Sequence, residues 1–209
     1  MTTSRLVPTP HGDARLHVDR AKSPVATLVL GHGAGGGVAA RDLAALARTL
    51  PAQGVSVFRV EQPWRVAGRK VASSARILDE AWLAVVNSLR PQTPLVVGGR
   101  SAGARVACRT ARHLGASGCL AMAFPLHAPG KPDKSRADEL TGAGVTTLVV
   151  QGDRDSFGAP DAFPSTVDLA VIPGADHGFA TLKRGELSQE DALSVLVEAA
   201  LEWLTREIA

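Results

Sequence analysis

Short apolar runs alternate with amphipathic stretches along most of this 209-residue chain. The runs are rich in Val, Leu and Ala and are bounded by Gly, Pro or charged residues, which is typical of strands buried on both faces of a sheet. They fall at 26–30, 55–60, 95–97, 118–123, 146–151 and 167–172. Two further runs, at 4–7 and 14–19, flank a turn at His11-Gly12-Asp13 and predict two short strands at the start of the chain.

Helices are predicted between these runs because apolar residues recur there at helical spacing. One helix covers 74–89 and is stopped by Pro91; its apolar face consists of Leu78, Trp82, Val85 and Leu89. Other helices are expected at about 40–50, after residue 103, at 134–140 and at 189–206. In the helix after residue 103, we expect Arg105, Arg109 and Arg112 to form a solvated face.

This alternation predicts an α/β fold, with a mainly parallel central sheet covered by helices on both faces, in a single domain over 1–209. Between 123 and 146 there is room for one short helix only, so we expect no cap domain. Ligands of such sheets bind at the carboxyl ends of the strands. The side chains that follow the strands are therefore the candidates for chemistry.

Gly99, Ser101 and Gly103 lie where the run at 95–97 gives way to a helix, and they fit the pattern Gly-x-Ser-x-Gly. This pattern is typical of a nucleophile elbow, in which the serine occupies a sharp strand-to-helix turn. Glycine is needed on both sides because a Cβ atom there would make the strand and the helix collide. The helix N-terminus also directs free N–H groups towards charge that develops beside the serine. Ser101 is therefore the candidate nucleophile.

A serine hydroxyl needs a base within hydrogen-bond reach. His32, His127 and His177 all follow strands. His177 lies in a Gly-flanked loop after the last strand, and such a loop can bring an imidazole over the edge of the sheet. We therefore predict that His177 is the base.

The base in turn needs an acceptor for its second nitrogen. Asp153 and Asp155 both follow the strand at 146–151, and Asp155 lies further into the loop, where its side chain can turn back towards the sheet edge. Asp155 is therefore the favoured acid. Asp153 and Asp176, which is adjacent to His177, stay as alternatives.

Two backbone N–H groups are candidates for an oxyanion hole. One belongs to Ala102, directly after the nucleophile, and the other to Ala34, in the glycine-rich loop after the strand at 26–30. Each such donor is typically worth about 2.7–4 kcal/mol of transition-state stabilisation. The chain also contains no tyrosine that could supply a phenol in place of a main-chain donor.

The amino-acid composition limits which binding partners and which cellular location we expect for this protein. The formal net charge is +3 and the Lys and Arg residues are scattered, which argues against a nucleic-acid partner. No apolar segment suggests a signal peptide or a membrane span, so we expect a cytoplasmic protein that does not contact a membrane. Cys108 and Cys119 are expected to be buried free thiols. No Cys or His spacing suggests a metal site, no cofactor is expected, and the oligomeric state is left open.

Four segments carry a resemblance to a known family: GHGAGG at 31–36, GGRSAG at 98–103, FPLH at 124–127 with GKP at 130–132, and QGDRDSFG at 151–158. From about residue 24 to its end the chain resembles the α/β hydrolases. It is most similar to a small capless group that includes dienelactone hydrolase-like proteins and, more closely, testis-expressed protein 30 and a related subunit of the NSL chromatin complex. The resemblance implies Ser101, Asp155 and His177 as a triad, with Ala34 and Ala102 at the oxyanion hole. Dienelactone hydrolases carry a cysteine nucleophile, so the serine here argues against their substrate.

Two alternatives to a hydrolase remain at this point. Gly31, Gly33 and Gly36 match the dinucleotide fingerprint Gly-x-Gly-x-x-Gly, and Glu61 ends the next strand where a ribose-binding acid would lie. That fingerprint needs a helix to open at its third glycine, whereas residues 37–39 delay the helix here. A dinucleotide-binding oxidoreductase is therefore the weaker alternative. The other is a hydrolase-fold scaffold that binds a protein partner.

A sheet edge without a cap predicts an open site and a small acyl substrate as the partner. We expect a short-chain ester or lactone, hydrolysed through an acyl-enzyme. Arg65 and Arg69, beside Lys70 in the loop 61–72, are candidate substrate-binding residues because exposed cations attract anionic groups. His127, which follows the strand at 118–123, is a third candidate.

Overall fold

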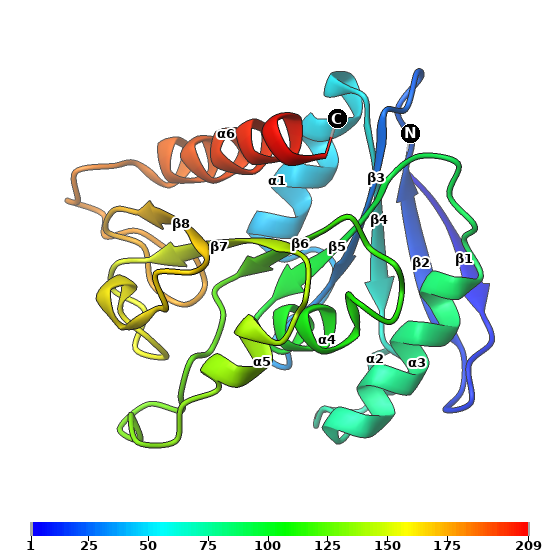
Figure 1. Cartoon of the computed structure of the whole chain (residues 1–209), viewed down its shortest axis with the longest axis horizontal. Helices are drawn as coiled ribbons and strands as arrows, with labels where there is room; N and C mark the ends of the chain where they lie inside the picture. The colour runs from blue at the N-terminus through cyan, green and yellow to red at the C-terminus, as the bar shows by residue number, and fades with distance from the viewer. Residues whose placement is uncertain (1, 209) are drawn as a thin grey trace.

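The computed structural model describes residues 2–208 and contains one eight-stranded sheet in the order β1-β2-β4-β3-β5-β6-β7-β8 (Figure 1). Strands β3 to β8 run parallel, whereas β2 is antiparallel to both of its neighbours, β1 and β4. The strands are β1 (Thr3–Val7), β2 (Ala14–Asp19), β3 (Ala26–Gly31), β4 (Val55–Glu61), β5 (Leu95–Arg100), β6 (Gly118–Met122), β7 (Thr146–Gly152) and β8 (Asp168–Ile172). The mainly parallel sheet is confirmed, and the predicted strands match it to within one residue at their ends, except that β5 continues for three residues beyond the run at 95–97.

Helices cover both faces of the sheet, as predicted. They are α1 (Arg41–Thr49), α2 (Pro63–Val66), α3 (Ala75–Asn87), α4 (Ala102–Thr110), α5 (Ala137–Thr141) and α6 (Gln189–Glu207), with short 3-10 turns η1 (Leu50–Gln53) and η2 (Pro160–Ala162). Helices α1 and α6 pack on one face, and α3 and α4 lie on the other (Figure 1). Among residues 2–208, no helix has the length and apolarity that a membrane span requires.

Strand β3 shows why its sequence is apolar throughout. Successive side chains of a strand point to opposite faces. Leu28 and Leu30 therefore enter the core under α1 and α6, while Val29 enters the core under α3 and α4. All six residues of β3 are buried, because helices cover both faces.

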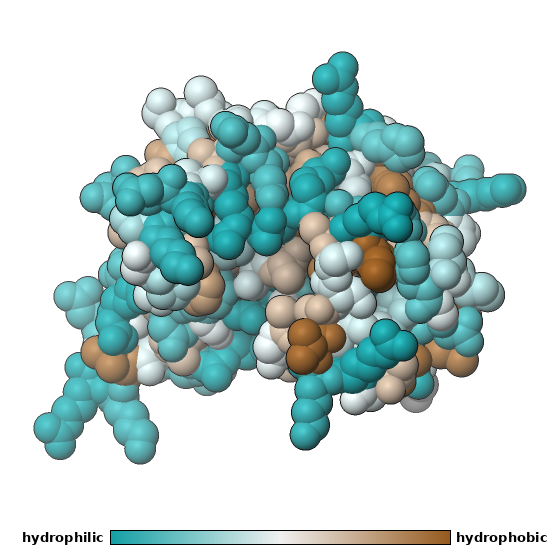
Figure 2. Space-filling view, turned by 90° about the horizontal axis from the view of Figure 1, so that it is seen from below, coloured by the Kyte–Doolittle hydropathy of each residue, from teal (hydrophilic) through white to brown (hydrophobic). Residues whose placement is uncertain are grey.

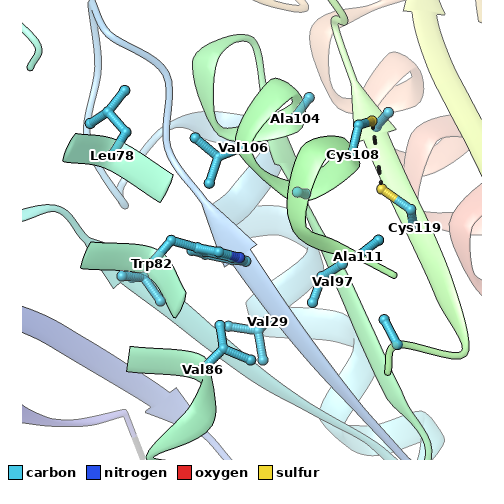
Figure 3. Packing of buried hydrophobic residues seen from close by; sticks show 14 of the residues in the cluster. Val29, Leu78, Trp82, Val86, Val97, Ala104, Val106, Cys108, Ala111 and Cys119 are labelled. Carbon is cyan, nitrogen blue, oxygen red and sulfur yellow. Dashed lines mark hydrogen bonds between the residues drawn. The ribbon is translucent and has the colours of Figure 1, made fainter. Parts of the chain in front are cut away.

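Small side chains let α4 lie close to the sheet. Ala104 and Ala111 face β5 and β6, and Trp82 of α3 fills the space beside them over Val29 (Figure 3). Cys108 and Cys119 are buried free thiols, as predicted, with their Sγ atoms 3.7 Å apart. Because α4 lies close to the sheet, the turn between β5 and α4 is held in one position.

Two helix predictions need correction. The loop 61–72 contains α2, which sequence patterning missed; Pro63 suits its first position, where no intrahelical N–H bond is lost. The helix predicted at 134–140 begins only at Ala137. The backbone N–H of Arg136 bonds instead to the carbonyl of Leu126, which keeps the preceding residues in turns.

Arg105 and Arg109 do not form a simply solvated face. Arg105 donates to Glu139 of α5, with its Nε 2.8 Å from Oε2. Arg109 donates to Glu139 and also to Asp79 of α3, at 2.8 Å from its Nε. These pairs link α3, α4 and α5 on the outside of the sheet. The charge pattern alone could not show this, because the acidic partners lie on other helices.

The glycine-rich loop after β3 does not fit the dinucleotide fingerprint. Residues 33–36 form a turn, in which Gly36 N–H bonds to the carbonyl of Gly33 at 3.4 Å, and α1 begins only at Arg41. A phosphate-binding helix would have to open at Gly36. The structure therefore argues against the oxidoreductase alternative.

Figure 2 views the molecule from the edge at which the parallel strands end. Hydrophobic residues are visible there only as small, separate patches among hydrophilic side chains. The segment between β6 and β7 contributes one short helix, α5, and no cap domain. The carboxyl ends of the strands are thus accessible to small molecules.

Candidate active site

Ser101 lies in the turn between β5 and α4 with a φ of 52°, a strained backbone conformation for a residue that has a Cβ atom. The turn is possible because the chain approaches the end of β3 through glycines. A Cβ atom at Gly99 would come within 2.5 Å of the carbonyl oxygen of Gly31, and one at Gly103 within 2.3 Å of the same oxygen. Both glycines of the motif are therefore required by backbone packing.

Ser101, His177 and Asp155 form a hydrogen-bonded chain. Ser101 Oγ lies 2.9 Å from His177 Nε2, and His177 Nδ1 lies 2.7 Å from Asp155 Oδ2. An ionised carboxylate only accepts hydrogen bonds, so Nδ1 donates its proton to Asp155 and Nε2 is left to accept the hydroxyl of Ser101. This arrangement allows a proton to pass from the serine to the imidazole.

Asp155 is buried and both of its oxygens accept hydrogen bonds. Oδ1 accepts from the backbone N–H of Phe157 at 2.8 Å, and Oδ2 accepts from Gln151 Nε2 at 2.9 Å as well as from His177. Gln151 and Phe157 are thus part of the site, although neither was singled out from the sequence. Their positions follow from the turn at 152–158, which folds the chain back over the end of β7.

The two alternative acids have other environments. Asp153 is exposed. Asp176 accepts the backbone N–H groups of Gly178 at 2.7 Å and Ala180 at 2.8 Å through Oδ1. Asp176 therefore shapes the loop that carries His177, and the structure brings only Asp155 to the imidazole.

The two predicted oxyanion donors lie beside Ser101. The N–H of Ala102 is the first of α4, where no carbonyl one turn earlier can accept it. Ala34 follows Gly33, and a Cβ atom at Gly33 would come within 3.3 Å of Ser101 Cβ. Ala34 and Ala102 both line one small crevice next to the nucleophile.

The order Ser, Asp, His along a mainly parallel sheet is that of the α/β hydrolases. The family model described as alpha/beta hydrolase domain matches residues 24–205, which is most of the chain. The chain belongs to the α/β-hydrolase family.

Solved structures of other hydrolases superpose on almost all of this hydrolase. A lidless α/β serine hydrolase from Xanthomonas campestris is 22% identical, with a TM-score of 0.73, and the match covers 97% of this chain and 94% of that chain. A serine hydrolase homologue from Coxiella burnetii is 20% identical, with a TM-score of 0.75 and coverage of 95% and 98%. A dienelactone hydrolase from Anabaena variabilis is 15% identical, with a TM-score of 0.76 and coverage of 100% and 99%. At such identities these likenesses show the fold. Among curated proteins, none matches this chain in sequence.

Sequence reasoning missed an ion pair behind the elbow of this hydrolase. Arg100 Nε donates to Asp42 Oδ2 at 3.1 Å, and the two side chains are only 11% and 0% exposed. The second branch of the guanidinium donates to the carbonyl of His177 at 2.6 Å. Burial raises the pKa of Asp42, while Arg100 acts in the opposite direction. Arg100 therefore connects the first turn of α1 to the main chain of His177.

His32 is tied to the backbone on both sides. Its Nδ1 donates to the carbonyl of Gly33 at 2.8 Å, and its Nε2 accepts the N–H of Gln62 at 3.1 Å. Burial lowers the pKa of His32. The neutral imidazole therefore joins the loop that carries Ala34 to the start of α2.

The three candidate substrate-binding residues have different surroundings, and within residues 2–208 none is hydrogen-bonded to Ser101 or His177. Arg65 and Arg69 are exposed, and Arg65 lies against the glycine-rich loop, with its Nε 3.8 Å from where a Cβ atom of Gly37 would be. His127 is half-buried, and its backbone N–H donates to the carbonyl of Phe157 at 2.9 Å. Phe157 in turn stacks on His177, with ring centroids 4.1 Å apart. In the described part of the chain, no group of three or more His, Cys, Asp or Glu side chains is arranged to hold a metal ion.

Proposed function

We propose that this protein is a serine hydrolase that cleaves small esters or lactones through an acyl-enzyme. The observation that carries the proposal is the hydrogen-bonded chain from Ser101 through His177 to Asp155, which starts at a strained elbow. Ser101 is the nucleophile, His177 the general base and Asp155 the group that fixes the tautomer of His177.

In the first half of the reaction, His177 Nε2 takes the hydroxyl proton while Ser101 Oγ attacks the carbonyl carbon of the ester. The negative charge that develops on the carbonyl oxygen is stabilised by the N–H groups of Ala34 and Ala102. The intermediate then collapses, and the bond to the leaving oxygen breaks. The protonated His177 gives its proton to that oxygen, and the alcohol leaves.

In the second half, a water molecule takes the place of the serine. His177 accepts a proton from the water, whose oxygen attacks the acyl carbon, and the same two N–H groups stabilise the second oxyanion. The ester bond to Ser101 breaks as His177 returns the proton to Oγ. The carboxylic acid leaves and the enzyme is restored. In a lactone the alcohol and the acid belong to one product molecule.

The surroundings of the site support small substrates. No cap domain covers the carboxyl ends of the strands, and the sheet edge is largely hydrophilic (Figure 2). Arg65 and Arg69 are exposed and positively charged, and Arg65 lies against the glycine-rich loop; His127 bonds through its backbone to Phe157, which stacks on His177. We therefore include in the proposal a modest preference for esters that bear a carboxylate.

The motifs at 31–36, 98–103 and 151–158 also support a finer placement within the family. We propose that the chain belongs to the small capless group that contains testis-expressed protein 30 and the related NSL-complex subunit. We further propose a cytoplasmic location, because free thiols such as Cys108 and Cys119 are common where disulfides are kept reduced.

Covalent labelling tests the proposal. A fluorophosphonate probe should form an adduct on Ser101, identified by mass spectrometry, and the Ser101→Ala variant should remain unlabelled. The same variant should lose hydrolysis of p-nitrophenyl acetate. Absence of labelling on a folded wild-type protein would overturn the proposal and favour the scaffold that binds a protein partner.

A further inference from the structure

A small crevice lies beside the oxyanion donors. It has a volume of about 10 Å³ and is lined by residues that include Ala34 and Ala102. Its apolar wall includes Leu78 and Trp82 of α3 and Val106 of α4 (Figure 3). A space of roughly 10–15 Å³ on this measure holds about one water-sized group. The crevice thus has room for at most one small group, such as the methyl of an acetyl ester, and for no longer chain.

A much larger hollow lies on the other side of α2. Its volume is about 440 Å³, and it is lined by the β1–β2 turn at His11 to Asp13, by α2 and by the start of α3, including Ile77. Two residues, Gln62 and Trp64, line both the hollow and the crevice. These two side chains therefore form the partition between the two spaces.

The partition is held by three contacts, two to His32 and one to Leu78. Trp64 is only 3% exposed, and its ring lies 5.6 Å from the ring of His32, centroid to centroid. The backbone N–H of Gln62 donates to His32 Nε2 at 3.1 Å, and its side-chain Nε2 donates to the carbonyl of Leu78 at 3.2 Å. The partition thus contacts His32, in the glycine-rich loop after β3, and α3, so a substrate cannot displace it without breaking these contacts.

We propose that Trp64 sets the acyl-chain limit of this hydrolase: the crevice accepts the methyl group of an acetyl ester, and the indole of Trp64 blocks longer chains from the hollow behind it. This inference rests on the proposed function and narrows it to acetyl esters. Gln62 positions Trp64 by tying α2 to His32 and Leu78. One surplus methylene group in a closed pocket typically lowers kcat/KM by about 10- to 200-fold, so kcat/KM should fall steeply as the acyl chain lengthens.

The test is a series of p-nitrophenyl esters with acetyl, butyryl, hexanoyl and octanoyl chains. For the wild type, kcat/KM should fall by at least about tenfold from acetyl to butyryl. Trp64→Ala should raise kcat/KM for hexanoyl esters by at least about tenfold, because the crevice then opens into the hollow, and should lower it for acetyl esters. Trp64→Leu, which keeps more contact with the core, should give a smaller shift in the same direction.

The matched control is Ile77→Ala, which enlarges the hollow but leaves the partition intact. It should keep the wild-type chain-length profile. Circular dichroism and thermal melting establish that each variant is folded. If Trp64→Ala does not fold, Trp64→Leu decides the question.

Two results separate this inference from the proposed function. A wild type that cleaves acetyl and hexanoyl esters equally well, or folded Trp64 variants with the wild-type profile, would overturn the role of Trp64 while Ser101 labelling still supports the hydrolase. A wild type that neither hydrolyses any ester nor reacts with the fluorophosphonate overturns the proposed function and the inference with it.

Discussion

His177 and His32 lie at the same edge of the sheet, and each uses both of its ring nitrogens, yet their partners give them opposite properties. His177 donates to the carboxylate of Asp155 and faces the hydroxyl of Ser101. His32 donates to a backbone carbonyl and accepts a backbone N–H from Gln62. A carboxylate stabilises an imidazolium, so His177 is suited to gain a proton. A proton on Nε2 of His32 would point at the N–H of Gln62, so His32 is held neutral.

Burial reinforces this difference. The side chain of His177 is 22% exposed and can meet a substrate, whereas His32 as a whole is 3% exposed. For a histidine that follows a strand, the hydrogen-bond partner of its second ring nitrogen therefore decides whether the imidazole can serve in proton transfer or holds the structure together. Three predictions test the two roles and a fourth tests the exposed cations nearby, in order of decreasing effect.

The largest effect is expected on the His177 side. Asp155→Asn should lower kcat for p-nitrophenyl acetate by on the order of 10³- to 10⁴-fold, because an amide in this position favours the wrong tautomer of His177. The thermal melting temperature should change little by comparison. The matched control is Asp153→Asn, two residues away and exposed, which should keep nearly full activity. Equal losses in the two variants would show that Asp155 has no special role.

A smaller effect is expected from Arg100, which holds His177 by its main chain. Arg100→Lys keeps a positive charge beside Asp42, but an ammonium lacks the planar fork that reaches both Asp42 and the His177 carbonyl. A displaced imidazole should lower kcat by about 10- to 100-fold with KM nearly unchanged. Lysine is preferred to an apolar residue here, since leaving the buried Asp42 unpaired costs about 3–5 kcal/mol in folding stability.

Arg105→Lys serves as the control for this variant, because Arg105 pairs with Glu139 on the outside of α4. Its kcat should match that of the wild type. A loss in Arg100→Lys that falls on KM alone would contradict a positioning role for Arg100.

On the His32 side the expected effect is on stability and its pH dependence. Burial lowers the pKa of His32 below its ordinary value of about 6.5, so the folded state resists protonation that the unfolded chain accepts. The stabilising contribution of His32 is therefore present above that pH and is lost as the pH falls. At pH 7.5, His32→Gln should destabilise the fold by about 1–3 kcal/mol, because buried backbone groups lose a partner.

Thermal melting of both proteins at pH 7.5 and pH 5.5 measures this contribution. The difference in melting temperature between the wild type and His32→Gln should be smaller at the lower pH. Burial also lowers the pKa of His17, but His17 is present in both proteins, so the difference isolates His32. His113→Gln, at an exposed position, should have the same melting temperature as the wild type at both pH values. A difference in melting temperature that grows on acidification would show that His32 is charged in the folded state.

The smallest effect concerns the exposed cations beside the His32 loop. The double variant Arg65→Ala with Arg69→Ala should lose a severalfold preference for acetate esters of alcohols that bear a carboxylate over neutral acetate esters of similar size. That preference should also weaken with added salt in the wild type, because exposed charges are screened. Arg5→Ala, on β1, is the control. An unchanged preference in the double variant would remove Arg65 and Arg69 from substrate binding.

Much of the architecture was predictable because it is encoded locally. The periods of the apolar residues gave the strand and helix order, and Gly99 and Gly103 marked the elbow through a backbone constraint that acts within a few residues. The candidates Ser101, Asp155 and His177 followed from one rule, that side chains after parallel strands meet at one edge. Helix α2 was missed because its four residues show no periodicity.

What the sequence by itself determined is therefore the α/β hydrolase fold and which residues follow its strands. Only the tertiary structure decided which of these side chains meet. Asp155 rather than Asp153 reaches His177 because the turn after β7 folds back over the strand end. Arg100 meets Asp42 of α1, and Gln62 meets His32, across chain separations of 58 and 30 residues. No local pattern encodes such contacts, because the distance between two strand ends depends on the order and register of the whole sheet.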